Sequence, residues 1–146
     1  MTLIKTAGVL VFSKNKVLLV KNTLNSNHLT DTYGIPAGKI KVEVGELPEE
    51  TAILKLRDES GLITELHNLI RMPIEYTAKI KTKDGIKSFS LVVFVCTNWK
   101  GELKGGIGTS PEWVPLNKVN KLNLLPNVDK IIKDGKCHIH PIKVNR

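Results

Sequence analysis

The sequence predicts one layered α/β domain over residues 1–146, with helices packed on a β-sheet. Three observations support this prediction. Short apolar runs typical of strands occur in both halves of the chain, one segment with clear helix start and stop signals lies between them, and the two kinds of element follow each other in mixed order. A length of 146 residues is enough for one domain with a sizeable core.

Strands are expected on both sides of this helical segment. The expected strands cover residues 6–12, 16–20, 75–82 and 88–97, with tight turns at 13–15 and at Asp84-Gly85. A polar loop is expected at 22–32, a short apolar segment at 113–116 and a closing helix at 128–133.

The helix itself is expected over Pro48–Ser60. Proline suits the first helical position, Glu49 and Glu50 suit the positive end of the helix dipole, and Gly61 ends the helix. Its expected buried stripe, at helical spacing, is Ala52, Ile53 and Leu56.

Composition narrows the class of protein. Hydrophobic residues make up 41% and charged residues 25% of the chain, as is usual for soluble globular proteins. No apolar run approaches the roughly 18 to 20 residues of a membrane span, and residues 1–5 lack the basic-then-apolar order of a signal peptide. A cytoplasmic protein is therefore expected, with no membrane partner.

The net charge of +8 is unevenly distributed. Residues 38–62 carry six acids and four bases, a net charge of −2, so the rest of the chain carries +10. An acidic segment within a basic chain is consistent with a metal ion surrounded by groups that attract phosphate. The alternative is that the lysines form an ordinary solvated surface.

The two cysteines agree with a reducing compartment. Cys96 lies in the apolar run 91–96 and is expected to be a reduced core residue. Cys137, His138 and His140 are metal-ligand types, but ligands so close together do not easily reach one tetrahedral ion. A surface tail is the favoured interpretation.

Adjacent acids near the end of the expected helix form the main candidate site. Asp58 and Glu59 are expected to point outward there, and a glycine turn around Gly38 is expected to bring backbone carbonyls towards them. Mg²⁺ prefers a few such oxygens together with the phosphate oxygens of a substrate. Asp-Glu before Ser-Gly is also common at solvated helix ends, so local physics alone leaves both interpretations open.

A longer pattern resembles the Nudix box. It consists of Gly38, Glu46 and the segment 54–62, Leu-Lys-Leu-Arg-Asp-Glu-Ser-Gly-Leu. The family pattern is Gly, five residues, Glu, seven residues, Arg-Glu, an aliphatic, any residue, Glu-Glu, any residue, Gly and an aliphatic. Further similar segments lie at 7–11, 16–20, 33–39 and 110–116, so the resemblance covers residues 5 to 130.

This resemblance implies an α/β/α sandwich around a mixed β-sheet, and a pyrophosphohydrolase. Family members cleave a nucleoside diphosphate linked to another group, with Mg²⁺ or Mn²⁺ on the box helix and an activated water that attacks phosphorus. Carried over to this chain, the metal ligands are Gly38, Asp58 and Glu59, and the catalytic residues are Glu59, Asp58 and Glu46. Glu59 is the first choice as a metal ligand.

The chain departs from the family pattern at several positions. Seven residues instead of five separate Gly38 from Glu46, and Asp58 is one methylene shorter than the family Glu. Leu54 stands where the family Arg braces the loop, and Lys55 stands where the family has a metal-binding or proton-accepting Glu. Lys55 opposes a metal ion but would suit a bare phosphate. The candidate replacement carboxylates are Glu43, Glu102 and Glu112.

Candidate substrate-binding residues are Tyr33, Lys39 and Lys21. Tyr33 or Trp113 could stack on a base, although an aromatic side chain beside a sheet more often belongs to the core. Lys21, Lys39 and Lys41 could meet phosphates, and His28 is expected to be a plain surface residue.

Two functions from different classes follow. The leading hypothesis is a Mg²⁺-dependent Nudix hydrolase of a nucleotide-type pyrophosphate. The alternative is a Nudix fold that has lost hydrolysis and binds a nucleotide or RNA. Nucleic-acid binding by the basic surface alone ranks last, because the chain lacks the interleaved aromatics of a stacking platform. The sequence leaves open whether the chain forms a homodimer.

Overall fold

The computed structural model describes residues 3–23, 30–82 and 84–144, and the side chains among them up to residue 137. His28, Lys83 and the side chains of His138 and His140 therefore lie outside the described residues.

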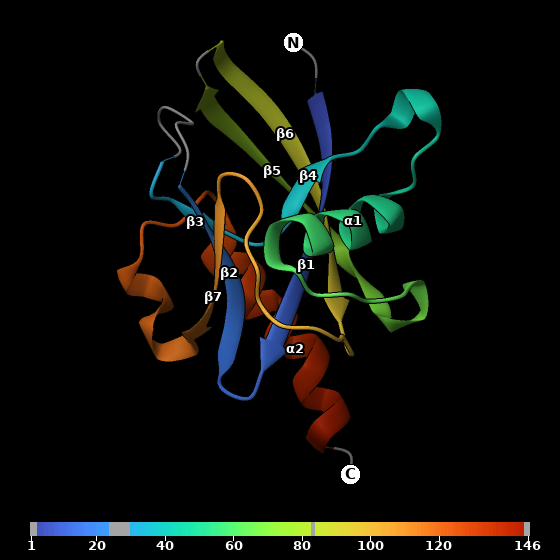
Figure 1. Cartoon of the computed structure of the whole chain (residues 1–146), viewed down its shortest axis with the longest axis vertical. Coiled ribbons are helices and arrows are strands. Elements are labelled where there is room, and N and C mark those ends of the chain that lie inside the picture. The colour runs from blue at the N-terminus through green and yellow to red at the C-terminus, as the bar shows by residue number, and fades with distance from the viewer. Residues whose placement is uncertain (1–2, 24–29, 83, 145–146) are drawn as a thin grey trace.

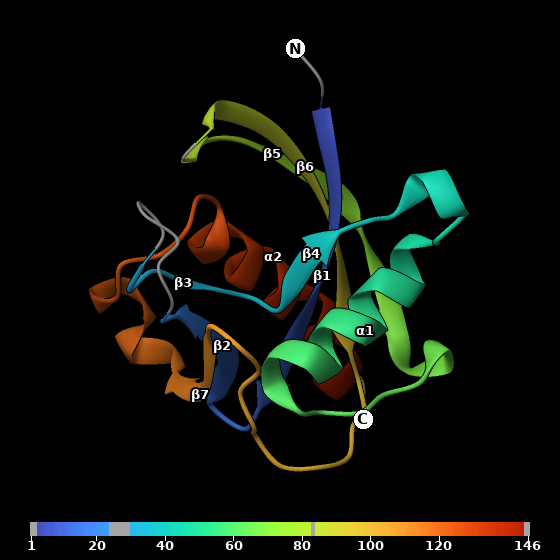
Figure 2. The ribbon, with the colours of Figure 1, turned by 45° about the horizontal axis from the view of Figure 1, so that its top comes forward.

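The described strands form one mixed sheet, and two helices cover its opposite faces (Figure 1). The strands are β1 Leu3–Ser13, β2 Lys16–Asn22, β3 Tyr33–Gly34, β4 Ala37–Lys39, β5 Leu69–Thr82, β6 Gly85–Cys96 and β7 Thr109–Pro115. The helices are α1 Pro48–Ser60 and α2 Val128–Val144, with short 3-10 segments at Val42–Val44 (η2), Leu66–Asn68 (η3) and Leu116–Lys121 (η4). Figure 2 shows α1 and α2 on either side of β1 and β4.

The strand β1 lies in the middle of the sheet, whose order is β3-β2-β1-β6-β5. It runs parallel to β6 from Leu3 to Val11 and antiparallel to its other partners. Along its other edge, β1 pairs with β4 at Thr6–Gly8 and with β2 at Phe12–Ser13. This division of one edge places the short strand β4 beside α1.

Alternate residues of β1 enter two different cores, because successive side chains of a strand point to opposite faces. Ala7 and Val9 pack with Ala52 and Leu56 of α1. Leu10 packs on the other face with residues that include Ile131 of α2. α2 comes so close to the sheet that a Cβ at Gly135 would overlap the Leu10 side chain. The two helices are thus held by the same strand.

The predicted α/β/α layering and the predicted helix Pro48–Ser60 are confirmed. Within that helix, Ala52 and Leu56 are buried as predicted, Ile53 is only half-buried, and Thr51 is buried as well. The closing helix is longer than predicted and continues to Val144. In the described chain, no helix has the length and apolarity that crossing a membrane requires.

The prediction of a glycine turn around Gly38 is wrong. Residues Tyr33–Gly34 and Ala37–Lys39 form short strands, and Gly38 is paired with Ala7 of β1. Gly38 does not have the left-handed backbone of a glycine turn, unlike Gly45 (φ 79°) at the end of η2 and Gly61 (φ 82°) at the end of α1.

Candidate functional site

The Lys55 side chain of α1 lies directly against Gly38 of β4. A Cβ added at Gly38 would lie 3.0 Å from Lys55 Cγ and 2.7 Å from Lys55 Cδ, and closer still to Cε. Carbon atoms in contact normally lie about 3.5–4.0 Å apart. The absence of a Cβ at position 38 therefore gives the alkyl chain of Lys55 room to lie on the strand, and a larger residue there would displace the flexible end of this side chain.

Glu59 contacts the same strand one helical turn further on. Its Oε1 accepts a hydrogen bond of 3.2 Å from the backbone N–H of Ala37, and its side chain is half-buried. Burial raises the pKa of Glu59 to about 7; the Ala37 bond and the Lys55 charge oppose this rise, and the Asp58 charge adds to it. The sequence contained no signal for the Ala37 N–H as a partner, because an N–H donor exists at almost every position.

Asp58 points to a different partner. Its Oδ1 lies 3.4 Å from Nη2 of Arg57, and its side chain is 47% exposed. The neighbouring acids Asp58 and Glu59 thus face an exposed guanidinium and a strand backbone respectively. Their assignment as metal ligands and catalytic residues stays a prediction.

Glu46 lies at the other end of α1. Its Oε1 accepts hydrogen bonds from the Thr51 hydroxyl (2.6 Å) and from the Lys41 N–H (3.1 Å). These two bonds hold the pKa of Glu46 below its usual value. They also fasten the lengthened 39–47 loop to the start of the helix. About 16 Å of helix rise separates Pro48 from Glu59, so Glu46 and Glu59 belong to different ends of the element.

Sequence reasoning missed Thr51. The available signal was a hydroxyl residue on the buried side of an amphipathic helix, next to Ala52, five residues after an acid. Buried hydroxyls normally have a hydrogen-bond partner, and Glu46 is the acid within reach.

Two of the three candidate substrate-binding residues lie together on neighbouring strands. Lys21 of β2 is the cross-strand partner of Tyr33 of β3. The Tyr33 hydroxyl donates to Glu112 Oε2 at 3.1 Å, and burial together with this bond raises the pKa of Tyr33. Lys21 Nζ lies 3.6 Å from Asp31 Oδ1. Lys39 is separate from this pair and exposed on β4. Their substrate roles stay predictions.

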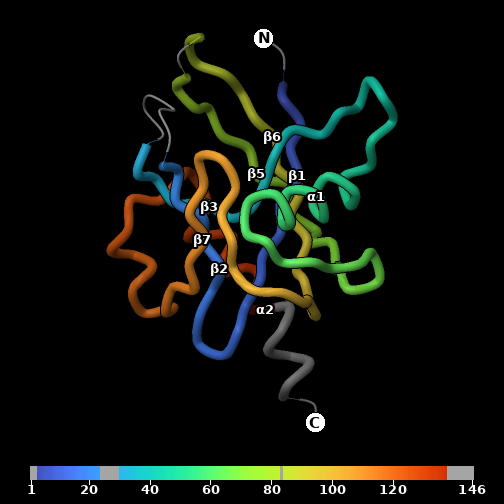
Figure 3. Tube along the Cα trace, in the orientation of Figure 1, coloured from blue at the N-terminus to red at the C-terminus, as the bar shows by residue number. Residues whose placement is uncertain are grey.

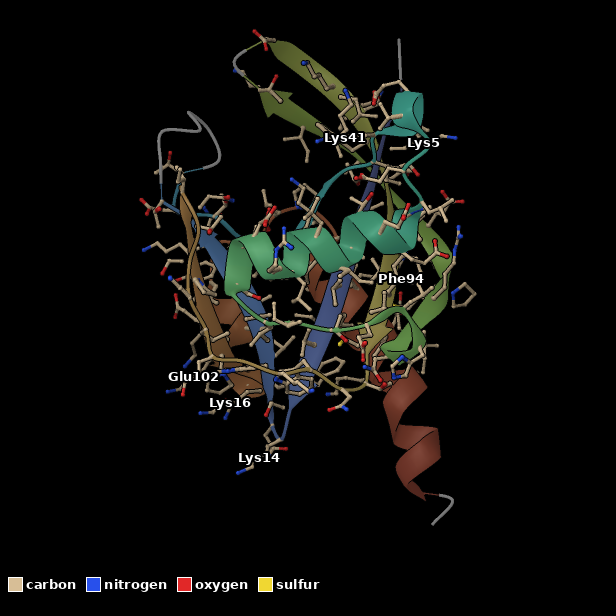
Figure 4. All side chains as sticks on the ribbon, turned by 45° about the vertical axis from the view of Figure 1, so that its right-hand side comes forward. Lys5, Lys14, Lys16, Lys41, Phe94 and Glu102 are labelled. Atoms are coloured by element: carbon tan, nitrogen blue, oxygen red, sulfur yellow. The ribbon has the colours of Figure 1, made fainter. Side chains whose placement is uncertain are left out.

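The remaining candidate residues are either exposed or packed on the core. Glu43 is exposed in η2, and Glu102 is exposed, with its backbone carbonyl against Gly61. Figure 4 shows Glu102 toward the end of the molecule that holds Lys16, away from Lys41. Trp113 packs on Trp99, with ring centroids 5.7 Å apart, and on the core beneath α1. This packing favours the core interpretation of Trp113.

The chain between β6 and β7 closes the C-terminal end of α1, and Figure 3 shows this segment passing beside the helix. The Lys104 N–H donates to the Ser60 carbonyl at 2.7 Å, and the Thr109 hydroxyl donates to the Glu59 carbonyl at 3.3 Å. These bonds satisfy carbonyls that a helix end leaves without partners.

A cavity of about 290 Å³ lies on the α2 side of the sheet and ends at β4. Its walls are mostly apolar and include Ile35, Ala78, Ile80, Leu91 and Ile131. Ala37 and Gly38 also line it. The same two residues contact Glu59 and Lys55, so the cavity and the charged residues of α1 meet at one short strand.

The residues of α1 do not fit the divalent ion that the Nudix resemblance implies. Among the described residues, no three His, Cys, Asp or Glu side chains are grouped to hold a metal. The Lys55 side chain lies on Gly38, where the resemblance places a carbonyl that faces the metal. Asp58 is paired with Arg57. A cationic side chain therefore occupies the region where a cation was expected.

Comparison with known proteins agrees with the fold. The chain is 31% identical over 121 residues to an ADP-ribose pyrophosphatase of Methanocaldococcus jannaschii, which covers 82% of this chain and 65% of the relative. It is 23% identical over 125 residues to an 8-oxo-dGTP diphosphatase of Escherichia coli K12, which covers 86% of this chain and 89% of the relative.

A solved structure shows the same architecture. The NUDIX domain of Shewanella oneidensis NrtR, crystallised with ADP ribose, superposes with a TM-score of 0.73 at 17% identity, over 95% of this chain and 90% of that one. The profile described as NUDIX domain matches residues 2–135. The chain therefore belongs to the NUDIX domain family.

Proposed function

We propose that this chain binds a nucleoside diphosphate linked to a second group. The base or another flat apolar group enters the cavity, and the diphosphate passes along β4. One observation supports this most directly: Ala37 and Gly38 line the cavity and also contact Glu59 and Lys55. A volume of about 290 Å³ suits one such group, since pockets for whole drug-sized ligands begin near 300 Å³.

ADP-ribose is the first ligand to test. One relative is an ADP-ribose pyrophosphatase, and one structural neighbour was crystallised with ADP ribose. In this chain, Lys55 lies against Gly38 and the exposed Lys39 follows Gly38 on β4, so two lysines adjoin the proposed diphosphate path.

Hydrolysis of the same ligand is the second candidate function. Glu59 supports it, because a half-buried acid with a pKa of about 7 is partly ionised at neutral pH and could accept a proton from water. Leu54 and Lys55 count against it, because they replace the Arg-Glu of the family pattern.

The test is calorimetric titration of the full chain with ADP-ribose, ADP and 8-oxo-dGTP, followed by a cleavage assay of each with Mg²⁺ or Mn²⁺. Binding of at least one nucleotide is expected. Ala78→Phe, which fills the cavity, is expected to abolish binding, whereas Thr77→Phe, one position along β5 and exposed, is the matched control.

The absence of binding to every nucleotide would contradict the proposal, as would equal binding by Ala78→Phe. Cleavage that is lost in Glu59→Gln would establish the second candidate in addition to the first. Thermal unfolding of each variant shows whether it is folded.

A further inference from the structure

We infer that Lys55 provides the positive charge for the diphosphate, so that this chain binds its ligand without a divalent cation. The inference rests on the proposed function and concerns the same site. It starts from the disagreement between the family pattern and this chain at one position of α1.

The placement of Lys55 is specific. Its alkyl chain lies across Gly38 in the space that a Cβ at position 38 would take, so the backbone of β4 and the side chain of α1 are in contact. Gly38 also forms part of the cavity wall. Lys55 therefore contacts, from the α1 side, a residue that lines the cavity on the α2 side.

The Lys55 ammonium is available to a ligand. In the part of the chain that the structure describes, the ion pairs are Lys21 with Asp31, Arg57 with Asp58, and Lys87 with Asp84, and none involves Lys55. Glu59, four residues further along the helix, uses Oε1 to accept the Ala37 N–H. The Lys55 side chain is half-buried, and its charge acts on Glu59 and Glu46 without forming an ion pair with either. Such an ammonium is suited to a phosphate oxygen.

The charges also favour this assignment. A divalent ion needs several oxygen ligands, and an ammonium beside it repels it. In this chain, position 55, where the family pattern has an acid, is a lysine, and Asp58 faces Arg57. A diphosphate brings its own negative charge, which Lys55 attracts at close range while Lys39 lies on the same strand as Gly38.

The experiment is titration of the full chain with ADP-ribose, once in EDTA and once in excess Mg²⁺, with inorganic pyrophosphate and adenosine as partial ligands. Binding in EDTA, unchanged or weakened by Mg²⁺, is expected. Lys55→Met keeps the alkyl packing on Gly38 and removes the charge. This variant is expected to bind ADP-ribose and pyrophosphate about 10- to 100-fold more weakly than the wild type and to bind adenosine with the same affinity.

Two variants complete the design. Lys16→Met removes an exposed lysine of β2, at the end of the molecule opposite Lys41 (Figure 4). This variant is expected to bind the ligands like the wild type. Lys55→Glu restores the acid of the family pattern and is expected to bind Mn²⁺, measured by electron paramagnetic resonance without nucleotide, where the wild type does not.

The outcomes separate the two proposals. Binding that requires Mg²⁺, or equal pyrophosphate affinity of the wild type and Lys55→Met, would overturn the inference and leave the proposed function standing. No nucleotide binding with or without metal would overturn both. Circular dichroism and thermal unfolding confirm that each variant is folded.

Discussion

At the residue scale, Gly38 of β4 and Lys55 of α1 are in direct contact, which joins two elements. Gly38 has no left-handed backbone, so its conformation alone would accept other residues. The alkyl chain of Lys55 occupies the space of a Cβ there and would have to move to admit one. Glu59 lies one turn further along α1 and is held by the Ala37 N–H at 3.2 Å. Each side chain is placed by the backbone of β4 and not by its own neighbours in sequence.

Glu59→Gln is expected to change the pH dependence of stability. The folded-state pKa of Glu59 is raised from 4.5 to about 7, so the folded chain holds this proton more tightly than the unfolded chain. The contribution is fully present below pH 4.5 and is lost as the pH rises to about 7. Relative to Glu59→Gln, the wild type is expected to lose about 3 kcal/mol between pH 4 and pH 8.

Urea unfolding at both pH values measures this difference. The two proteins should have similar free energies of unfolding at pH 4, and the variant should be the more stable at pH 8. A difference that does not change with pH would show that the carboxylate titrates normally.

At the scale of elements, hydrogen bonds between α1 and the adjoining loops fix both ends of the helix. Its first turn is bound through Glu50, which accepts the Leu47 N–H at 2.8 Å, and through the pair of Glu46 and Thr51. Its last carbonyls are bound by the segment before β7. The 39–47 loop accommodates its two extra residues because Glu46 hydrogen-bonds both to Lys41 in the loop and to Thr51 in the first turn of the helix.

Thr51→Val is expected to destabilise the fold by about 1 kcal/mol, because it removes the 2.6 Å hydrogen bond to Glu46 while it keeps the shape of the buried side chain. Thr51→Ser keeps the hydroxyl and is the matched control. Chemical denaturation at pH 7 measures both. The proposed role of Thr51 would be wrong if Val were tolerated better than Ser.

At the scale of the whole molecule, the candidate site depends on three layers at once. The cavity is bounded by the sheet, by the β3–β4 segment and by the start of α2, while Lys55 and Glu59 approach from α1 on the opposite face. Tyr76 of β5 links two of these layers: its hydroxyl donates to Asp134 Oδ2 of α2 at 2.7 Å, and its ring lines the cavity. Burial and this bond raise the pKa of Tyr76.

Tyr76→Phe is expected to lower the free energy of unfolding by about 1 kcal/mol, since it removes one hydrogen bond and keeps the ring. For a domain of this size, the melting temperature should fall by about 2–4 °C. Tyr33→Phe, which loses a more exposed bond to Glu112, is the control and should change less. Equal shifts in the two variants would show that the link to α2 does not contribute.

The sequence alone determined the family resemblance, the layered α/β class and the bounds of α1, because start signals, stop signals and helical periodicity act within one element. It did not determine that residues 37–39 form a strand, since those residues pair with β1 some thirty positions earlier in the chain. It also did not determine the partners of Glu59, Asp58 and Lys55. These depend on how closely α1 and β4 approach, which is set by the packing of both on β1. Only the tertiary structure therefore decided which α1 side chains lie against β4.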